Sequence, residues 1–367
     1  MRIGTIGCGA IARQYLDTAR RLDAIEIVAA ADRVPARATA VEAAEGIPAM
    51  PVADLLANAE VDVVLNLTIP AAHAAIALQA IAAGKAVYGE KPLAATTAEA
   101  RSILEAAGAA GVQVGCAPDT VLGTGIQTAR KTVDDGRIGA PIAATATMVT
   151  PGHERWHPDP DFYYQPGGGP LLDMGPYYVT ALVTILGPVV AAIGAASRTR
   201  GTRTIRSGAR AGETVPVAVD SHVTGALIHE SGAISTLVMS FDAVASRASR
   251  IEIHGELGSL IAPDPNLFRG DVELRELDGT GWVTLPISAG YERSSRGYGI
   301  ADLAATPAGE EPRAGGALAF HVLDVMESLL ESARTGRRVD VASRCPRPAP
   351  VPLQSLPGSD AEIPTYH

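Results

Sequence analysis

Residues 2–12 read RIGTIGCGAIA, and they predict a parallel α/β sheet at the start of the chain. RIGTIG is an apolar run typical of a buried strand, and apolar residues at helical spacing follow it. Between the two lies the pattern G-x-G-x-x-A. Gly7 permits a tight turn, Gly9 lets backbone N–H groups approach a pyrophosphate, and Ala12 allows close packing. Asp32 ends the next strand, about 20 residues beyond the pattern, as expected of a dinucleotide-binding βαβ unit.

Strand and helix patterns continue to alternate through the first 120 residues. Further apolar strands are predicted at residues 24–32, 61–68, 85–90 and 112–118, and helical segments lie between them. Pro35 and Pro70 are placed as first helical residues, and Thr96 with Glu99 forms a capping box. Strands separated by helices predict a doubly wound parallel sheet, so residues 1–120 are assigned to an α/β Rossmann domain.

The pattern changes after residue 120, where long β-type runs separated by glycine-containing turns replace the alternation. These runs predict a large, mostly antiparallel sheet in an α+β domain over residues 121–345. A late helix is predicted to end at Gly336. Residues 346–367 form a proline-rich tail, which is expected to be extended along the surface.

Composition excludes several functional classes. The 367 residues carry a formal net charge of −10, which argues against a general nucleic-acid-binding protein. No apolar run is long enough to predict a membrane span. Three cysteines without a C-x-x-C pair favour neither a disulfide framework nor a zinc site, and they fit a reducing, cytoplasmic setting. The arginine-rich stretch 197–210 is interpreted as a solvated loop in preference to an anion site or subunit-docking site.

Four stretches of the sequence resemble the Gfo/Idh/MocA (glucose–fructose oxidoreductase, inositol dehydrogenase, rhizopine catabolism) family. They are GCGAIA at 7–12, AADR at 30–33, residues 69–94 with the motif EKP, and residues 167–189 with GGGPLLDMG. The resemblance implies a Rossmann domain followed by an open-faced sheet used for assembly into a homodimer or homotetramer. It also implies hydride transfer between NAD(P) and a hydroxyl or carbonyl group of a sugar, cyclitol or related polyol.

The cofactor is expected to be NAD. Asp32 can accept hydrogen bonds from the adenosine ribose hydroxyls and would repel a 2′-phosphate, whereas the neighbouring Arg33 keeps NADP possible. The predicted cofactor contacts are Gly7, Cys8, Gly9, Ala10, Ile11, Ala12, Asp32, Arg33, Thr68, Pro70, His73, Glu90 and Lys91.

The resemblance implies that Lys91 of the EKP motif acts at the catalytic centre. An ammonium at the carboxyl end of a parallel strand can stabilise negative charge that develops on a reacting oxygen, and Glu90 can orient it. Asp173 and Tyr177 complete the predicted catalytic set, since a spacing of four places them on one helix face. The family usually shows a histidine at the position of Tyr177, and some members carry tyrosine, so His157 stays open as an alternative proton relay.

The segment GHERWHPDPDFYYQPGGG, residues 152–169, is predicted to be a shaped loop that binds polyol substrate. Its expected substrate contacts are Trp156, His157 and Tyr163, joined by Asp119 from the end of an earlier strand. A metal site is the alternative, but a His-x-x-x-His pair suits a metal on a helix and three prolines make this segment a loop. No metal is therefore expected.

Three functional classes fit these residues. The leading hypothesis is an NAD-dependent dehydrogenase or reductase of sugars or polyols. The alternatives are a glycoside hydrolase of the same fold that retains NAD, and a non-catalytic protein that senses dinucleotide and acts through partners. Loss of the lysine would mark the last class, and Lys91 is present.

Overall fold

The computed structural model describes residues 1–307 and 309–359, and these form two compact units. Unit 1 contains residues 1–127, 288–320 and 348–359, and unit 2 contains residues 128–287 and 321–347. The boundaries proposed from the sequence, at 120 and 345, therefore differ from the observed division. Two late segments return to the N-terminal unit.

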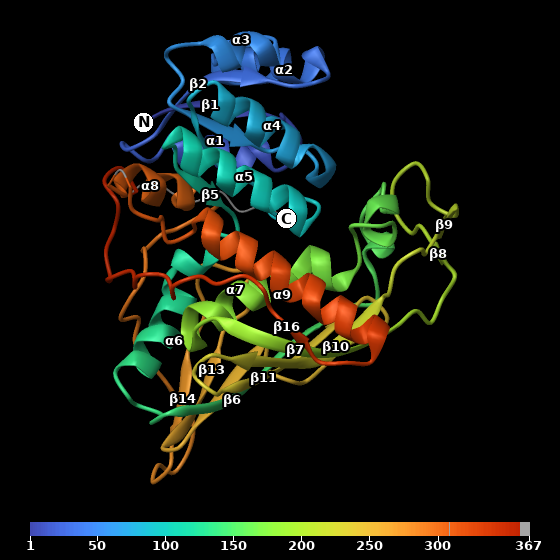
Figure 1. Cartoon of the computed structure of the whole chain (residues 1–367), viewed down its shortest axis with the longest axis vertical. Helices are drawn as coiled ribbons and strands as arrows, with labels where there is room; N and C mark the ends of the chain where they lie inside the picture. The colour runs from blue at the N-terminus through green and yellow to red at the C-terminus, as the bar shows by residue number, and fades with distance from the viewer. Residues whose placement is uncertain (308, 360–367) are drawn as a thin grey trace. The chain divides into compact units, whose positions relative to one another are not determined.

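Unit 1 is built on the predicted parallel sheet, so this part of the fold prediction is confirmed (Figure 1). Its five strands have the order β2-β1-β3-β4-β5 and are all parallel neighbours. Their bounds are β1 Arg2–Ile6, β2 Glu26–Ala31, β3 Val63–Asn66, β4 Ala86–Gly89 and β5 Val114–Cys116. The strand order reverses between β1 and β3, and ligands of such sheets bind beyond the carboxyl ends of strands at this switch point.

The helices between these strands are α1 Ala12–Ala19, α2 Pro35–Glu45, α3 Val52–Ala57, α4 Pro70–Ala82 and α5 Thr97–Ala110. Three of them, α2, α4 and α5, begin where the sequence signals place them. Pro35 and Pro70 are first helical residues, where a missing N–H costs nothing. Thr96 caps α5 by accepting a 3.2 Å hydrogen bond from the backbone N–H of Glu99.

Late residues complete the core of unit 1. The core cluster contains Ile3 and Tyr88 of the sheet together with Tyr291, Tyr298 and Val351. Tyr298 opens α8 (Tyr298–Ala305), and a short 3₁₀ turn, η1 (Thr120–Leu122), lies after β5. Val351 has no exposed surface, so the described part of the proline-rich segment is anchored in the core at this residue. Residues 360–367 of the predicted tail lie outside the described residues.

Unit 2 is built on a nine-stranded sheet of order β15-β14-β13-β12-β6-β11-β10-β7-β16. Neighbouring strands are antiparallel except β11 and β6, which confirms the predicted mostly antiparallel sheet. The bounds are β6 Pro141–Val149, β7 Val189–Ser197, β10 His222–His229, β11 Ile234–Ser240, β12 Ile251–Gly255, β13 Gly258–Ala262, β14 Glu273–Glu276, β15 Val283–Thr284 and β16 Val339–Asp340.

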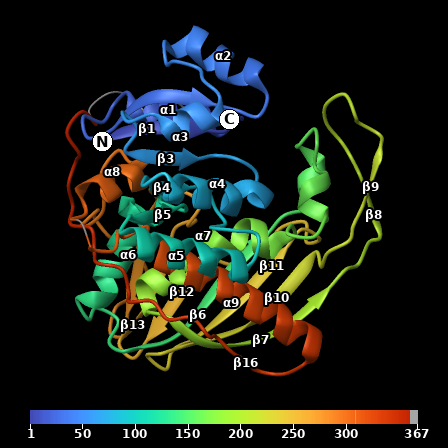
Figure 2. The same cartoon turned by 45° about the horizontal axis from the view of Figure 1, so that its top comes forward.

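Helices pack on one face of this sheet. They are α7 (Pro170–Leu186) and the second half of α9 (Gly316–Thr335), and Figure 2 shows both above the strands. Gly194 and Gly225 pair across β7 and β10, and a Cβ on either would collide with Leu329 of α9. The opposite face carries Ile193, Thr236 and Thr145, which are exposed. α6 (Thr124–Asp134) and α9 each begin in unit 1 and end in unit 2.

A small hairpin, β8 (Thr202–Thr204) with β9 (Thr214–Pro216), extends from the large sheet (Figure 2). It packs against two 3₁₀ turns, η2 (His153–Arg155) and η3 (Asp161–Tyr164). The interpretation of residues 197–210 as a solvated loop is wrong for Arg203, which lies on β8 and is 3% exposed. Among the described residues, no helix is both long enough and apolar enough to cross a membrane.

Candidate active site

The glycine loop after β1 has the shape that a dinucleotide requires. Gly7 has φ +104°, and a Cβ there would lie 2.6 Å from the carbonyl carbon of Leu67, so only glycine fits. A Cβ on Gly9 would meet nothing within 4 Å, which leaves its backbone open to a phosphate group. The loop therefore fits the pyrophosphate of NAD, and residues 7–12 are the group that would hold it.

Asp32 fastens this loop to the end of β2. Its Oδ2 accepts a 2.8 Å hydrogen bond from the backbone N–H of Cys8, and its Oδ1 accepts one of 2.8 Å from Val34. Burial and the nearby Asp32 carboxylate raise the pKa of the Cys8 thiol to about 11, so this cysteine stays protonated near neutral pH. Asp32 is half-buried and Arg33 is exposed, an arrangement that leaves a carboxylate beside the expected ribose position.

His73, one of the predicted cofactor contacts, bridges two backbone segments. Its side chain is 2% exposed, with Nδ1 2.6 Å from the carbonyl oxygen of Pro92 and Nε2 3.0 Å from that of Thr68. The imidazole thus joins the loop after β3 to the loop that follows Lys91. Asn66 supports the same junction, because its amide donates to the His73 carbonyl and its Oδ1 accepts from the Thr68 hydroxyl at 2.6 Å.

Glu90 holds the backbone that carries the predicted catalytic lysine. This buried carboxylate accepts a 2.8 Å hydrogen bond from the Tyr15 hydroxyl at Oε1 and one of 3.0 Å from the backbone N–H of Lys91 at Oε2. Lys91 itself is half-buried. The structure therefore gives Glu90 a role in fixing the position of Lys91 through its main chain, at the carboxyl end of β4.

Asp119 does not lie on an accessible wall, as its predicted role in substrate binding would require. It has no exposed surface, and its Oδ2 accepts hydrogen bonds from the backbone N–H groups of Gly297 at 2.8 Å and Gly299 at 3.0 Å. Burial raises its pKa to about 6, although both hydrogen bonds and Arg296 act in the opposite direction. Asp119 thus anchors the start of α8 to the loop after β5.

In unit 2, the other two predicted catalytic residues lie on α7. Pro170 opens the helix after three glycines, and Asp173 in the first turn donates its backbone N–H to the Gly169 carbonyl at 3.1 Å. Tyr177 is one turn further along and is 5% exposed, whereas the side chain of Asp173 is 18% exposed. An acidic residue in the first turn also stabilises a helix electrostatically.

The structure brings a residue outside the predicted set to Asp173. Nε2 of His153 lies 3.1 Å from Oδ2 of Asp173 and connects η2 with α7. The sequence offered no periodicity by which to choose His153 over His157, because both occur in the same proline-rich loop. His157 is directed differently: its Nδ1 accepts a 3.1 Å hydrogen bond from the backbone N–H of Asp159.

The predicted polyol-binding loop does gather its aromatic rings. Trp156 and Phe162 are 58% and 56% exposed. The ring centroid of His157 lies 5.4 Å from those of Trp156 and Phe162 and 5.5 Å from that of Tyr163, and Tyr163 and Phe162 are 4.0 Å apart. Exposed rings with polar tips suit the apolar faces and hydroxyls of sugars. The described residues contain no group of three or more histidine, cysteine or acidic side chains arranged to hold a metal ion.

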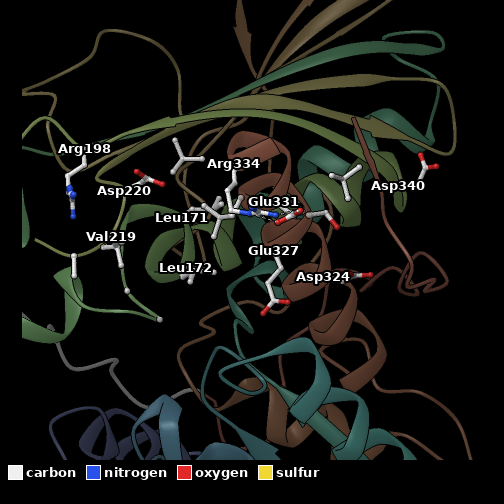
Figure 3. Close-up of a pocket in the computed structure, with 18 residues that line it drawn as sticks. Leu171, Leu172, Arg198, Val219, Asp220, Asp324, Glu327, Glu331, Arg334 and Asp340 are labelled. Carbon is white, nitrogen blue, oxygen red and sulfur yellow. Dashed lines mark hydrogen bonds and ion pairs between the residues drawn. The ribbon is translucent and has the colours of Figure 1, made fainter. Parts of the chain in front are cut away.

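A separate cavity of about 930 Å³ lies in unit 2 (Figure 3). Its lining includes Leu171, Leu172, Asp220, Glu327 and Glu331, and does not include Asp173, Tyr177 or the aromatic loop at 153–163. The cavity is therefore distinct from the predicted catalytic residues on α7 and from the aromatic loop.

Comparison with known proteins agrees with this geometry. Residues 1–117 match the model described as the oxidoreductase family with an NAD-binding Rossmann fold, and residues 126–261 match that of the GFO/IDH/MocA C-terminal domain. The 1,5-anhydro-D-fructose reductase of Ensifer adhaerens is 30% identical over 79% of this chain and 85% of its own length. The D-apiose dehydrogenase of Paraburkholderia graminis is 28% identical over 92% and 89%, respectively.

Solved structures show the same fold. An NAD-binding oxidoreductase from Klebsiella pneumoniae superposes with a TM-score of 0.80 at 23% identity, covering 94% of this chain and 99% of that one. A levoglucosan dehydrogenase in complex with NADH and L-sorbose has a TM-score of 0.77 at 20% identity, with coverage of 94% and 99%. Fold, glycine loop and sequence relatives lead to one conclusion: the chain belongs to the Gfo/Idh/MocA family of NAD-binding oxidoreductases.

Proposed function

We propose that this oxidoreductase interconverts a hydroxyl and a carbonyl group of a sugar, cyclitol or related polyol with NAD as its cofactor. The observation that carries the proposal is the placement of Lys91. It is half-buried at the carboxyl end of β4, and buried Glu90 bonds its main chain in the same unit as the open glycine loop. The names of the relatives, a reductase of anhydrofructose and a dehydrogenase of apiose, support the substrate class.

Bound NAD would accept the hydrogen and two electrons that leave the carbinol carbon during oxidation. In this proposal Lys91 donates a hydrogen bond to the substrate oxygen and stabilises its developing negative charge. The hydroxyl proton passes to the deprotonated oxygen of Tyr177, and Asp173, one helical turn earlier on α7, orients the phenol. A tyrosine has a pKa of about 10 in water, so this role near neutral pH requires a positive charge that lowers its pKa.

The aromatic loop is proposed to bind the remainder of the substrate. Exposed Trp156 offers a flat apolar surface, and half-buried His157 and Tyr163 carry polar atoms at its edge. Rings of this kind contact the C–H faces of a sugar while their polar tips bond hydroxyls. The acidic balance of the chain, −10, fits a neutral substrate better than an anionic one.

A substrate panel tests the reaction. Purified enzyme is mixed with NAD⁺ or NADP⁺ and with inositols, aldoses, ketoses and anhydro sugars, and absorbance is followed at 340 nm. At least one polyol should reduce NAD⁺. The matched variants are Lys91→Ala and Lys91→Arg: we expect kcat to fall far more than cofactor affinity in the alanine variant, because the lysine acts on transition-state charge.

The outcomes separate the functional classes. Hydrolysis of nitrophenyl glycosides without net NADH formation would identify an NAD-retaining hydrolase instead. Binding of NAD without turnover of any polyol in the panel or of any nitrophenyl glycoside would favour the dinucleotide sensor. Turnover that is unchanged in Lys91→Ala would remove this residue from the mechanism.

We also propose that the chain assembles as a homodimer or homotetramer through the exposed face of the large sheet. Strand register places Ile193, Ala226, Thr236 and Thr145 in one row across β7, β10, β11 and β6. These side chains are small or β-branched and carry no charge, as a sheet-on-sheet interface requires. A reducing, cytoplasmic location is proposed as well, since Cys8, Cys116 and Cys345 are all free thiols.

A further inference from the structure

His153 is enclosed by aromatic rings. Its side chain is 9% exposed, and the ring centroids of Phe241, Tyr163 and Trp156 lie 4.3, 4.6 and 5.1 Å from its own. Such neighbours exclude most water from the imidazole and leave its two nitrogens as the polar atoms that need partners. Both nitrogens have them, and the identity of the partners determines where the proton lies.

Trp156 determines the tautomer of His153. The indole Nε1 can only donate, and it lies 3.3 Å from Nδ1 of His153, so Nδ1 is the accepting nitrogen. The proton of the neutral imidazole is then on Nε2, which lies 3.1 Å from Oδ2 of Asp173. His153 therefore donates to the carboxylate that the proposed mechanism uses.

A buried ionic network holds the histidine from behind. The backbone N–H of His153 donates to the Tyr164 hydroxyl at 3.1 Å, and that hydroxyl donates to Glu154. Glu154 in turn accepts a 3.2 Å hydrogen bond from Nη1 of Arg203, whose side chain is 1% exposed. Nη2 of Arg203 bonds Asp242, which also accepts from the Ser221 hydroxyl at 2.7 Å.

This network has the features of a rigid support. A guanidinium withdrawn from water is tolerated when carboxylates and hydrogen bonds compensate it, and both terminal nitrogens of Arg203 have such partners, whereas its Nε has none among the described residues. Gly152, at φ +112°, has no room for a side chain because a Cβ would collide with Glu154 and Arg203. The loop is thus fastened directly before and after His153, and an arginine from the β8–β9 hairpin contributes to the fastening.

We propose that His153 is a positioning residue for Asp173, with its Nε2–H fixing the orientation of the carboxylate. The Arg203–Glu154–Tyr164 network sets the position of the imidazole, so the arginine-rich hairpin supports the site at a distance. The inference rests on the proposed function only for its effect on turnover, because the contact between His153 and Asp173 can be examined without a substrate.

The test compares two variants of His153. His153→Phe keeps a flat ring and removes both nitrogens, whereas His153→Gln keeps an N–H donor. On the polyol that the panel identifies, we expect kcat to fall about 10²-fold in the phenylalanine variant with a small change in KM, as misorientation of a catalytic group does. Glutamine should restore most of the loss. Equal defects in both variants, a defect confined to KM, or no defect would each overturn the proposal.

A spectroscopic measurement separates this inference from the proposed reaction. Nitrogen NMR of ¹⁵N-histidine-labelled protein at pH 8 should show the Nε2–H tautomer for His153, assigned by its loss in His153→Gln. Asp173→Leu should shift that Nε2–H resonance. A Nδ1–H tautomer, or a spectrum unaffected by Asp173→Leu, would overturn the inference whether or not any polyol is a substrate. NAD titration of each variant checks that the protein remains folded.

Discussion

The hydroxyl of Tyr15 donates a 2.8 Å hydrogen bond to Oε1 of Glu90, 75 residues further along the chain. Tyr15 lies on α1, the helix that follows the glycine loop, and Glu90 bonds the main chain of Lys91. One buried contact therefore connects the cofactor-binding helix with the segment that carries the lysine.

Replacing Tyr15 with phenylalanine should lower both the stability of the protein and its turnover rate. The variant leaves one oxygen of a buried carboxylate without its donor, so the free energy of unfolding should fall by about 1–3 kcal/mol. Chemical denaturation of the two proteins measures this loss, and kcat should decrease with it because the backbone of Lys91 is less well held. Unchanged stability would show that water replaces the phenol without cost.

Cofactor choice is expected to depend on Asp32 and not on Arg33. Calorimetric titration should give tighter binding of NAD than of NADP to the wild type, because a carboxylate beside the ribose repels a 2′-phosphate. Asp32→Ser should reduce the ratio of the two affinities by about tenfold or more, equivalent to about 1.4 kcal/mol. Arg33→Ala is the control. If the preference for NAD over NADP is instead lost in Arg33→Ala, the Arg33 guanidinium discriminates between the two cofactors.

Tyr177→Phe removes only the hydroxyl that the proposed mechanism uses. General acid–base groups contribute about 10²–10⁴-fold, so kcat should fall within that range and the pH–rate profile should lose one limb. His157→Asn provides the comparison, because His157 is the alternative relay. If the asparagine variant shows the large loss and the phenylalanine variant changes mainly KM, the loop histidine carries the proton.

Asp119 should make stability depend on pH between about 4 and 6. Its pKa is raised from 3.8 to about 6 in the folded state, so the native protein binds a proton more tightly than the unfolded chain, and stability falls as pH rises through this window. Asp119→Asn can keep an oxygen that accepts from Gly297 and Gly299 without the buried charge. The free energy of unfolding of the variant, relative to that of the wild type, should therefore increase by about 1–3 kcal/mol when the pH is raised from 4 to 8. Denaturation at both pH values measures the difference, and an equal pH dependence in the two proteins would contradict it.

The proposed assembly can be tested by placing a charge in the exposed row of the large sheet. Thr236→Arg puts a guanidinium among Ile193, Ala226 and Thr145, where an interface would withdraw the charge from water. Light scattering coupled to gel filtration should show oligomers for wild type and monomers for the variant. Arg137→Glu, at an exposed position outside the row, should not change the mass.

The cofactor loop was predictable because its geometry depends on neighbouring residues. Gly7, Gly9 and Asp32 lie within one βαβ unit, where strand and helix periodicity determine the position of each residue. The contact between His153 and Asp173 was not predictable, since it forms across a proline-rich loop without periodicity. Asp119 is similar: Gly297, which lies 178 residues away, covers it, and no local pattern indicates that a polar residue at the end of a strand will be buried.

The return of residues 348–359 to unit 1 has a consequence for the order of synthesis. Val351 belongs to the same core cluster as Ile3, so the N-terminal unit contains a part that the ribosome makes after residues 128–287 and 321–347 of unit 2. Consecutive domains usually fold from the N-terminus as they emerge. Here the nucleotide-binding unit is finished only after helix α7 and the whole large sheet have been translated. A nascent chain that stops before residue 351 thus presents a glycine loop on an unfinished core.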